Sequence, residues 1–298
     1  MIIAINDQHH PKWAHALQAT LNLPLCSHLA QPADMVLDWL NPDKDNATLH
    51  LALLPPDSGA VSVDFLAGKK AHRRQFGGGK GQPLARAMGN LATGLPNIID
   101  ATAGMGGDSF VLASLGFNVH MIERSPIVAA LLNDALTRAK QQLTNAGQTT
   151  HHIPTSDLDG LCAILNRLSL TNIDATDYLN SLKNDLINDS HTTQNRVDVV
   201  YLDPMYPEKK KVAATKKDMK ALQTLVGPDL DSEQLLSAAL RIAQYRVVVK
   251  RPKNAPALKC DWPISPLKTT NILPTAHISS PNTRYDIYSI KALKLNHS

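Results

Sequence analysis

Cysteines, aromatic residues and long apolar runs are all scarce in this sequence. Only three cysteines occur in 298 residues, and Cys26, Cys162 and Cys260 stand far apart from one another. Isolated cysteines match neither zinc-ligand spacing nor a disulfide framework, which argues against zinc and thiol redox chemistry, and no metal is expected. No apolar run approaches the roughly 18 residues of a membrane span, and the N-terminus lacks a basic signal-peptide region. A cytoplasmic protein that does not enter a membrane is therefore expected.

Charge is nearly balanced overall, but the basic residues are clustered. Hydrophobic residues make up 43% of the chain, charged residues 19% and aromatic residues 4%, and the net charge is +4. The candidate nucleic-acid contacts are Lys69, Lys70, Arg73, Arg74 and Lys80 in a glycine-rich connector, and Lys209, Lys210 and Lys211 further along. Such clusters are typical of contacts to the phosphates of a polynucleotide, with a flexible linker and an ordinary solvated surface as the alternatives.

The hydrophobic pattern predicts two α/β domains. Residues 1–75 are interpreted as a small N-terminal domain with a strand at IIAI, a helix after Pro11, and strands at ATLHLALL and AVSVDFL. Residues 76–298 alternate strands and helices, beginning with the strands NIIDA and GFNVHMIE. This alternation predicts a Rossmann-like domain, in which helices cover a parallel sheet.

The clearest helix signal follows the second of these strands. Ser125 is a suitable N-cap and Pro126 a suitable first residue, and apolar residues recur at positions 128, 131, 132, 135, 136, 139 and 143. Beyond it we expect a weak strand near LTNIDA, strands at VDVVYLD, YRVVVKRP and RYDIYSI, and helices at about 215–225 and 232–243. The polar stretch 180–196 is interpreted as a surface excursion.

A glycine loop, DATAGMGGD, connects the first predicted strand of the larger domain to its helix. Gly104, Gly106 and Ser109 occupy the places of the dinucleotide fingerprint, so the match to that motif is partial. Asp100 ends the strand before the loop and can accept hydrogen bonds from the amino group of a cationic ligand. Glu123 ends the next strand, where a carboxylate can hold both hydroxyls of a ribose.

Asp100, the glycines and Glu123 together resemble the cofactor site of methyltransferases that use S-adenosylmethionine (SAM). The alternatives are an NAD site and two acids that merely solvate the ends of strands.

The strand VVYL ends in Asp203-Pro204-Met205-Tyr206, which is chemically unusual for a buried strand. The Asp203 carboxylate and the Pro204 backbone carbonyl can accept the hydrogens of an exocyclic amine, and Tyr206 can stack on its base. The segment resembles the Asp/Asn-Pro-Pro-Tyr/Phe signature of amino-methyltransferases, with Met205 in place of the second proline. A simple acid-proline turn is the alternative.

Six blocks of the sequence resemble one family more closely. They are VDFLAGKKAHRRQFGGGKGQPLARAMG, DATAGMGGDSFVLASLGFNVHMIERSP, VVYLDPMYPEKKK, LVGPDLD, RVVVKRP and RYDIY. Together they resemble the RsmJ family, the ribosomal RNA small subunit methyltransferase J. The resemblance implies methylation of guanine N2 at one guanosine near the 3′ end of 16S ribosomal RNA, with SAM as the cofactor and 16S rRNA or the small ribosomal subunit as the partner.

The resemblance also implies a set of cofactor contacts. They are Gly107, Asp108, Glu123, Arg124, Thr176, Asp177 and Asp203, in addition to Asp100, Gly104 and Gly106. Thr176 and Asp177 fall where such folds contact the adenine ring. The remaining alternatives are amine methylation of another RNA or DNA base, an NAD-dependent oxidoreductase, and a non-catalytic RNA-binding factor.

Overall fold

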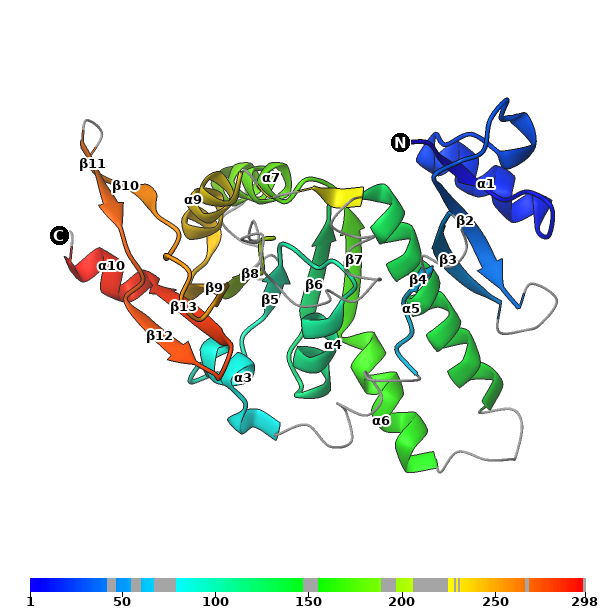
Figure 1. Cartoon of the computed structure of the whole chain (residues 1–298). Helices are drawn as coiled ribbons and strands as arrows, with labels where there is room; N and C mark the ends of the chain where they lie inside the picture. The colour runs from blue at the N-terminus through cyan, green and yellow to red at the C-terminus, as the bar shows by residue number, and fades with distance from the viewer. Residues whose placement is uncertain are drawn as a thin grey trace. The chain divides into compact units, whose positions relative to one another are not determined.

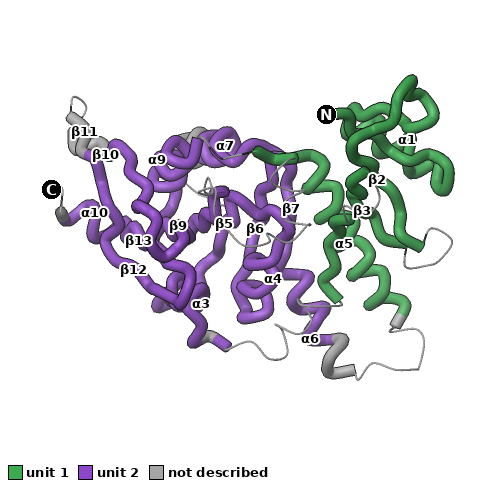
Figure 2. Tube along the Cα trace, in the orientation of Figure 1, with its two compact units in different colours: residues 1–68, 125–158, 208–228 green, residues 69–124, 159–207, 229–298 purple. Residues whose placement is uncertain are grey.

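The computed structural model of the chain (Figure 1) describes residues 1–41, 47–54, 60–66, 79–146, 155–188, 197–205, 225–227, 229, 231–265 and 268–296. It has two compact units that interleave along the sequence (Figure 2). Unit 1 comprises residues 1–68, 125–158 and 208–228, and unit 2 comprises residues 69–124, 159–207 and 229–298. The domain boundary expected between residues 75 and 76 falls outside the described ranges and stays a prediction.

Unit 1 contains a four-stranded sheet in the order β1-β2-β3-β4. Its elements are β1 (Ile3–Ile5), α1 (Pro11–Leu21), the short helix η1 (Cys26–His28), β2 (Met35–Leu40), β3 (Thr48–Leu53), β4 (Ala60–Ser62) and α5 (Pro126–Ala146). β1 runs parallel to β2, and the other pairs are antiparallel. The two strands and the helix expected before residue 54, and the strand at AVSVDFL, are confirmed, whereas β2 was not predicted.

Helix α5 belongs to unit 1 although it lies far from β1–β4 in the sequence. All seven apolar positions predicted for this helix are buried. The carboxylate of Asp134 accepts hydrogen bonds from the backbone N–H of Leu49 in β3 (3.2 Å) and from Nε of Arg138 (2.7 Å). Arg138, itself buried, donates from Nη2 to the carbonyl of Val63 (2.7 Å). The helix therefore holds β3 and the segment after β4 by polar contacts as well as by apolar packing.

Unit 2 is built on a seven-stranded sheet in the order β12-β13-β9-β8-β5-β6-β7. Its elements are η3 (Gly79–Gly81), α3 (Pro83–Met88), β5 (Ile98–Asp100), α4 (Gly107–Ser114), β6 (Val119–Glu123), most of α6 (Thr155–Asn166), β7 (Leu168–Asn172), α7 (Ala175–Asn188), β8 (Val199–Leu202), α9 (Ser232–Ile242), β9 (Arg246–Pro252), β10 (Cys260–Ser265), β11 (Lys268–Ile272), β12 (Ala276–Ser279), β13 (Thr283–Ser289) and α10 (Ile290–Asn296). The strands β7, β6, β5, β8 and β9 are all parallel, and β13 is antiparallel to β9.

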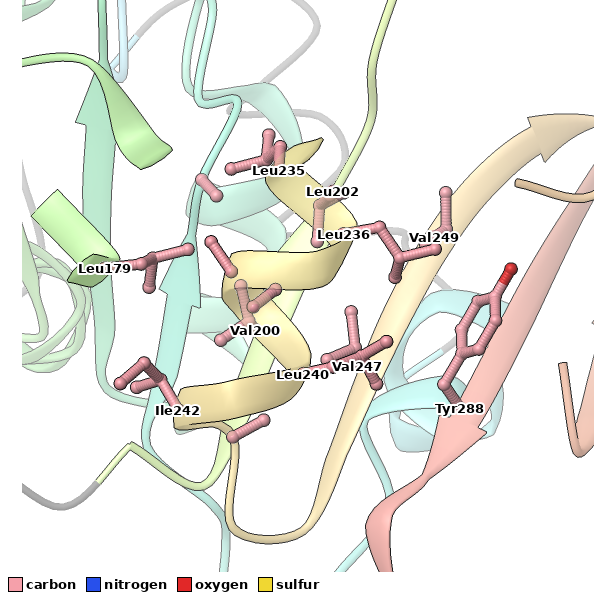
Figure 3. Packing of buried hydrophobic residues seen from close by; sticks show 14 of the residues in the cluster. Leu179, Val200, Leu202, Leu235, Leu236, Leu240, Ile242, Val247, Val249 and Tyr288 are labelled. Carbon is pink, nitrogen blue, oxygen red and sulfur yellow. The ribbon is translucent and has the colours of Figure 1, made fainter. Parts of the chain in front are cut away.

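The central strand β8 is apolar on both faces because both faces of the sheet are covered. On one face, α9 packs its leucines against β8 and β9 (Figure 3). The residues of this core include Leu235, Leu236, Leu240, Val200, Leu202, Val247 and Val249. Successive side chains of a strand alternate between faces, so Tyr201 and Lys250 point to the opposite face. That second face carries the polar groups of the candidate site.

The structure confirms the Rossmann-like α/β fold of the larger domain and most of its predicted strands. The strand expected near LTNIDA lies slightly earlier, at β7, and α7 extends to Asn188 into the stretch interpreted as an excursion. The helix predicted at 232–243 is α9, whereas the one at about 215–225 lies outside the described residues except for Leu225, which is helical. Among the described helices, none combines the length and the apolar character that crossing a membrane requires.

Candidate active site

The glycine loop follows β5 at the carboxyl edge of the parallel sheet, the edge at which doubly wound folds bind ligands. Gly104 and Gly106 both adopt the left-handed conformation, with φ of 51° and 66°, which strains any residue with a Cβ. The loop is fixed to the next strand by a bond from the N–H of Ala103 to the carbonyl of Ile122 (3.0 Å). Helix α4 then begins at Gly107, with open space where a Cβ would stand. A ligand can therefore approach the backbone closely here.

Asp100 is a buried acid whose partners are all uncharged donors. Its side chain is 2% exposed, and it accepts a bond from Oγ of Ser109 (2.5 Å) and one from the N–H of Thr102 (3.2 Å). Burial raises the pKa of Asp100 to about 7, against the lowering effect of these two bonds. A carboxyl group held in this way lacks a cationic partner among the described residues, so a cationic ligand would satisfy it.

Glu123 supports the same loop from the end of β6. It is also buried, and its Oε2 accepts a hydrogen bond from the N–H of Gly104 (2.9 Å). The end of β7 is tied to this position, because Nδ2 of Asn172 donates to the Glu123 carbonyl (2.7 Å). The acid at the end of β6 is therefore in direct contact with the glycine loop.

The strand register brings Asp203 and Lys250 together. Leu202 of β8 pairs with Val249 of β9, so Asp203, which follows β8, lies level with Lys250 within β9. Nζ of Lys250 lies 2.8 Å from Oδ2 of Asp203 and 2.8 Å from Oδ2 of Asp108, the second residue of α4. The hydroxyl of Tyr201 also donates to Asp108 (2.7 Å). One lysine thus joins the cofactor loop to the predicted amine acceptor.

Burial and the neighbouring charges shift the pKa values of the residues in this cluster. Burial raises the pKa of Asp203 and Lys250 lowers it, which leaves the pKa above that of an ordinary aspartate. Burial lowers the pKa of Lys250, but Asp203 and Asp108 outweigh it and raise the pKa above its usual value, so the lysine is charged. Burial and the adjacent acids raise the pKa of Tyr201 well above its normal range, so its hydroxyl stays a donor.

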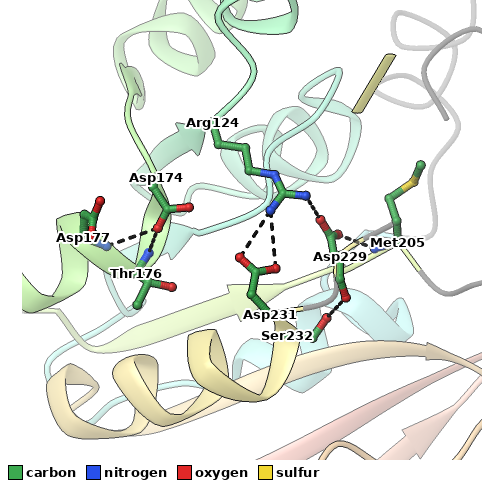
Figure 4. A network of polar contacts seen from close by, with 8 residues as sticks. All are labelled: Arg124, Asp174, Thr176, Asp177, Met205, Asp229, Asp231 and Ser232. Carbon is green, nitrogen blue, oxygen red and sulfur yellow. Dashed lines mark hydrogen bonds and ion pairs between the residues drawn. The ribbon is translucent and has the colours of Figure 1, made fainter. Parts of the chain in front are cut away.

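The turn after β8 is anchored at both ends. The N–H of Asp203 donates to Oγ1 of Thr102 in the glycine loop (2.6 Å), and the N–H of Met205 donates to Oδ2 of Asp229 (2.6 Å). Pro204 between them is buried. Arg124 forms an ion pair with Asp229 and a longer one with Asp231 (3.3 Å; Figure 4).

Thr176 and Asp177 lie in the first turn of α7. Oδ1 of Asp174 accepts the backbone N–H groups of both residues, at 2.8 and 3.3 Å, and so caps the helix (Figure 4). The capping acid is thus Asp174, which leaves the side chains of Thr176 and Asp177 available at the end of β7 beside β6.

Several predicted site residues lie outside the described part of the chain. They are Tyr206, Lys69, Lys70, Arg73, Arg74, Lys209, Lys210 and Lys211, and for Lys80 only the backbone is described. Sequence reasoning missed Lys250, Tyr201 and Asp229. A lysine in the otherwise valine-rich strand RVVVKRP was the available signal, because an unpaired charge is costly beside a buried strand. Among the described residues, no group of acids, histidines and cysteines is arranged to hold a metal ion.

Comparisons with known proteins identify the family and the fold. Residues 31–290 match the family described as SAM-dependent methyltransferase, so SAM is the methyl donor. The chain is 55% identical over 302 residues to the ribosomal RNA small subunit methyltransferase J of Hydrogenovibrio crunogenus, covering 98% of this chain and 96% of that protein. The protein of the same name from Chromobacterium violaceum is 40% identical over 282 residues, covering 94% of this chain and 93% of that protein.

A solved structure matches the fold as well. The crystal structure of a SAM-dependent methyltransferase from Neisseria gonorrhoeae superposes with a TM-score of 0.62 at 29% sequence identity. The match covers 96% of this chain and 95% of that chain. The similarity therefore extends over nearly the full sequence rather than over the Rossmann-like unit alone.

Proposed function

Because the chain belongs to the ribosomal RNA small subunit methyltransferase J family of SAM-dependent methyltransferases, we propose that it methylates the N2 amine of a guanosine near the 3′ end of 16S ribosomal RNA. The observation that carries the proposal is the position of Asp203. This acid follows a central strand, and its backbone N–H bonds to Thr102 in the glycine loop (2.6 Å). An amine acceptor and the expected donor site therefore share one edge of the sheet.

The residues around the glycine loop fit a cationic adenosine derivative. In our proposal Asp100 pairs with the ammonium group of the methyl donor, and Glu123 holds its ribose hydroxyls. The fit rests on the chemistry of the donor set, since the buried Asp100 has only uncharged hydrogen-bond partners among the described residues. Gly104 and Gly106 allow the close approach that such a ligand needs.

The other predicted contacts take secondary roles. Thr176 and Asp177 face the adenine ring, and Gly107 and Asp108 contribute from the start of α4. The guanidinium of Arg124 is committed to Asp229 and Asp231, so we assign its contact with the donor to its backbone.

Asp203 and Pro204 act on the nucleophile. The lone pair of an exocyclic amine is delocalised into its base, and two acceptors aimed at the amine hydrogens make that lone pair available. The bound donor supplies an electrophilic methyl group on a sulfonium: the new N–C bond forms as the S–C bond breaks, and the sulfur keeps the electron pair. The Asp203 carboxylate accepts the proton that the amine loses. Tyr206, outside the described residues, is proposed to stack on the base.

The basic residues hold the substrate. We propose that Lys69, Lys70, Arg73, Arg74, Lys80, Lys209, Lys210 and Lys211 contact RNA phosphates while the target base enters the pocket. If these residues contact phosphates, the affinity for small-subunit RNA should fall steeply as the salt concentration rises. Replacement of Lys209, Lys210 and Lys211 by methionine should make this affinity less dependent on salt. The reaction requires no metal, and its ribosomal substrate fits a cytoplasmic location.

The test is methylation of small subunits from cells that lack this modification. Tritiated SAM, the purified protein and either naked 16S rRNA or intact subunits are combined, and the modified nucleoside is identified by mass spectrometry. N2-methylguanosine near the 3′ end supports the proposal, and a preference for one of the two RNA forms identifies the natural substrate. The Asp203→Ala variant, which removes the acceptor oxygens, serves as the inactive control.

The alternatives give different results in the same experiments. Transfer to an adenine or cytosine amine would replace guanine as the target. SAM binding without any transfer would favour a non-catalytic RNA-binding factor. Calorimetry that detects NAD but not SAM would favour an oxidoreductase and overturn the proposal.

A further inference from the structure

The cation that forms an ion pair with Asp203 is Lys250, which lies in an inner strand of the sheet. Lys250 belongs to β9, a strand whose neighbouring valines are fully buried, and only 26% of its own side chain is exposed. Its Nζ contacts Asp203 and Asp108 equally, at 2.8 Å each. A half-buried lysine that bridges two carboxylates has lost much of its hydration, so its position must be maintained by these two partners.

The surroundings of Asp203 are otherwise negative. Asp108 from α4 and Asp229 from the segment before α9 both act to raise its pKa. Asp100 of β5 and Tyr201 of β8 are further ionisable groups of this cluster among the described residues. Within the described part of the chain, Lys250 is the cation that contacts Asp203, since Arg124 is paired with Asp229 and Asp231.

We propose that Lys250 is a positioning residue for methyl transfer, which keeps Asp203 ionised and holds its Oδ2 so that Oδ1 faces the target amine. The proposal rests on the function proposed above, because it takes Asp203 as the amine acceptor. Among the described residues, no hydrogen bond engages Oδ1 of Asp203, and 40% of this side chain is exposed, so a substrate can reach it. Lys250 itself does not touch the reacting atoms.

The bridge has a chemical consequence for turnover. Without a nearby cation, Asp203 would take up a proton to reduce its repulsion with Asp108 and Asp229. A protonated carboxyl group can neither accept the proton of the amine nor present two acceptor oxygens. Because turnover needs the ionised form, the loss of Lys250 should move the acidic fall of kcat to higher pH.

The experiment compares Lys250→Met and Lys250→Arg with the wild-type protein. We expect Lys250→Met to lower kcat at neutral pH roughly 100-fold and to move the acidic fall of kcat upward by about one pH unit or more. The Kd for SAM, measured by calorimetry, should change by less than about threefold. Lys250→Arg keeps the charge and should restore the wild-type pH profile. Lys291→Met, which removes an exposed lysine of α10, is the matched control.

A second measurement tests the role of Lys250 independently of the proposed guanine methylation. The carboxyl carbon of Asp203 is titrated by NMR in protein labelled at aspartate, with Asp203→Asn providing the assignment and no RNA present. A pKa that rises in Lys250→Met by about one unit or more supports the proposal even if no RNA is methylated. An unchanged pKa of Asp203 would contradict the proposal. Equal losses of kcat and SAM affinity with an unchanged pH profile would also contradict it and would show that Lys250 only stabilises the structure.

Discussion

The candidate site has two halves, one around Asp100 and one around Asp203, and these two acids have different kinds of partner. On the side of β5, the carboxyl group of Asp100 is buried and receives bonds from a hydroxyl and a backbone N–H, with no cation among its described partners. On the side of β8 and β9, the carboxylate of Asp203 is partly exposed and forms an ion pair with Lys250. Both acids end parallel strands, so the difference lies in their partners rather than in the fold.

The difference matches the charge of the group that each acid is proposed to meet. A cationic ligand gains most from an acid that no protein cation already neutralises. The target amine is neutral before the reaction, so it needs an ionised acceptor that is held in one orientation, and a fixed lysine provides that orientation. An ion pair with a protein cation before the substrate binds therefore suits Asp203. The same kind of ion pair would weaken the binding of a cationic ligand proposed for Asp100.

Replacement of Asp203 tests the acceptor half and should have the largest effect. Asp203→Ala is expected to lower kcat roughly 1,000-fold, because it removes the acceptor of the amine proton. The affinity for SAM should change by only about threefold or less. Single-turnover transfer of a tritiated methyl group and calorimetry measure the two quantities, with the exposed Asp261 replaced by alanine as the control. A comparable loss of SAM affinity would place Asp203 in the donor half as well.

Asp100→Asn tests the donor half and should show the reverse pattern. The Kd for SAM is expected to rise roughly 30-fold, the value of one charge-assisted hydrogen bond. Turnover at saturating SAM should stay within a few-fold of wild type, because the amine acceptor is untouched. Calorimetry and saturation kinetics separate the two effects. If kcat fell while the affinity for SAM stayed constant, the two halves could not be distinguished in this way.

The pH dependence of SAM binding sharpens the same contrast. Burial raises the pKa of Asp100 to about 7, so the group is largely protonated below that pH and loses its attraction for an ammonium group. Affinity is expected to fall about tenfold between pH 8 and pH 6, and binding near pH 7 should release a proton, seen by calorimetry in buffers of different ionisation enthalpy. Asp100→Asn should remove both effects, and a flat profile in the wild type would contradict the assignment.

The same raised pKa of Asp100 also affects folding. Between about pH 4 and pH 7 the folded protein holds a proton on Asp100 that the unfolded chain releases. In the ligand-free protein, this group therefore makes the fold less stable as pH rises through that window. Between pH 4 and pH 7, Tm should therefore fall more with rising pH, or rise less, in the wild type than in Asp100→Asn.

Arg124→Met should give the smallest effect. Its guanidinium supports Asp229, which in turn holds the N–H of Met205, so kcat is expected to fall about three- to tenfold through a looser turn. The affinity for SAM should not change. Replacement of the exposed Arg241 by methionine is the control. A selective loss of SAM affinity in Arg124→Met would instead favour a side-chain contact with the donor.

The sequence predicted the elements that depend on local patterns. Strand β8 and helix α5 were predicted because a buried central strand is continuously apolar and an amphipathic helix has a clear period. β2 was missed although MVLDWL alternates buried and half-buried residues, and β11 and β12 were missed because KTTNI and AHIS carry few apolar residues. The pairing of such short strands is decided by their neighbours.

The residues of the candidate site also differ in whether a local sequence pattern could predict them. Asp100, Glu123 and Asp203 were predictable because each is an acid at the end of an apolar strand. The link through Lys250 was not, since this residue is 47 positions from Asp203 and 142 from Asp108 in sequence. The register between β8 and β9 brings Lys250 to Asp203, and the position of α4 brings Asp108 to the same lysine. Both are properties of the assembled fold and not of a local sequence pattern.

The distant origin of α5 has a consequence for the newborn chain. Leu49 of β3 bonds to Asp134 of α5, which is 85 residues later in the sequence, so β3 leaves the ribosome well before this helix. At a synthesis rate of roughly 5–20 residues per second, the strands of unit 1 are made several seconds before α5, and the apolar residues that this helix covers stay exposed during that time. Unit 1, although it begins at the first residue, can finish folding only after the glycine loop and β6 of unit 2 have been synthesised.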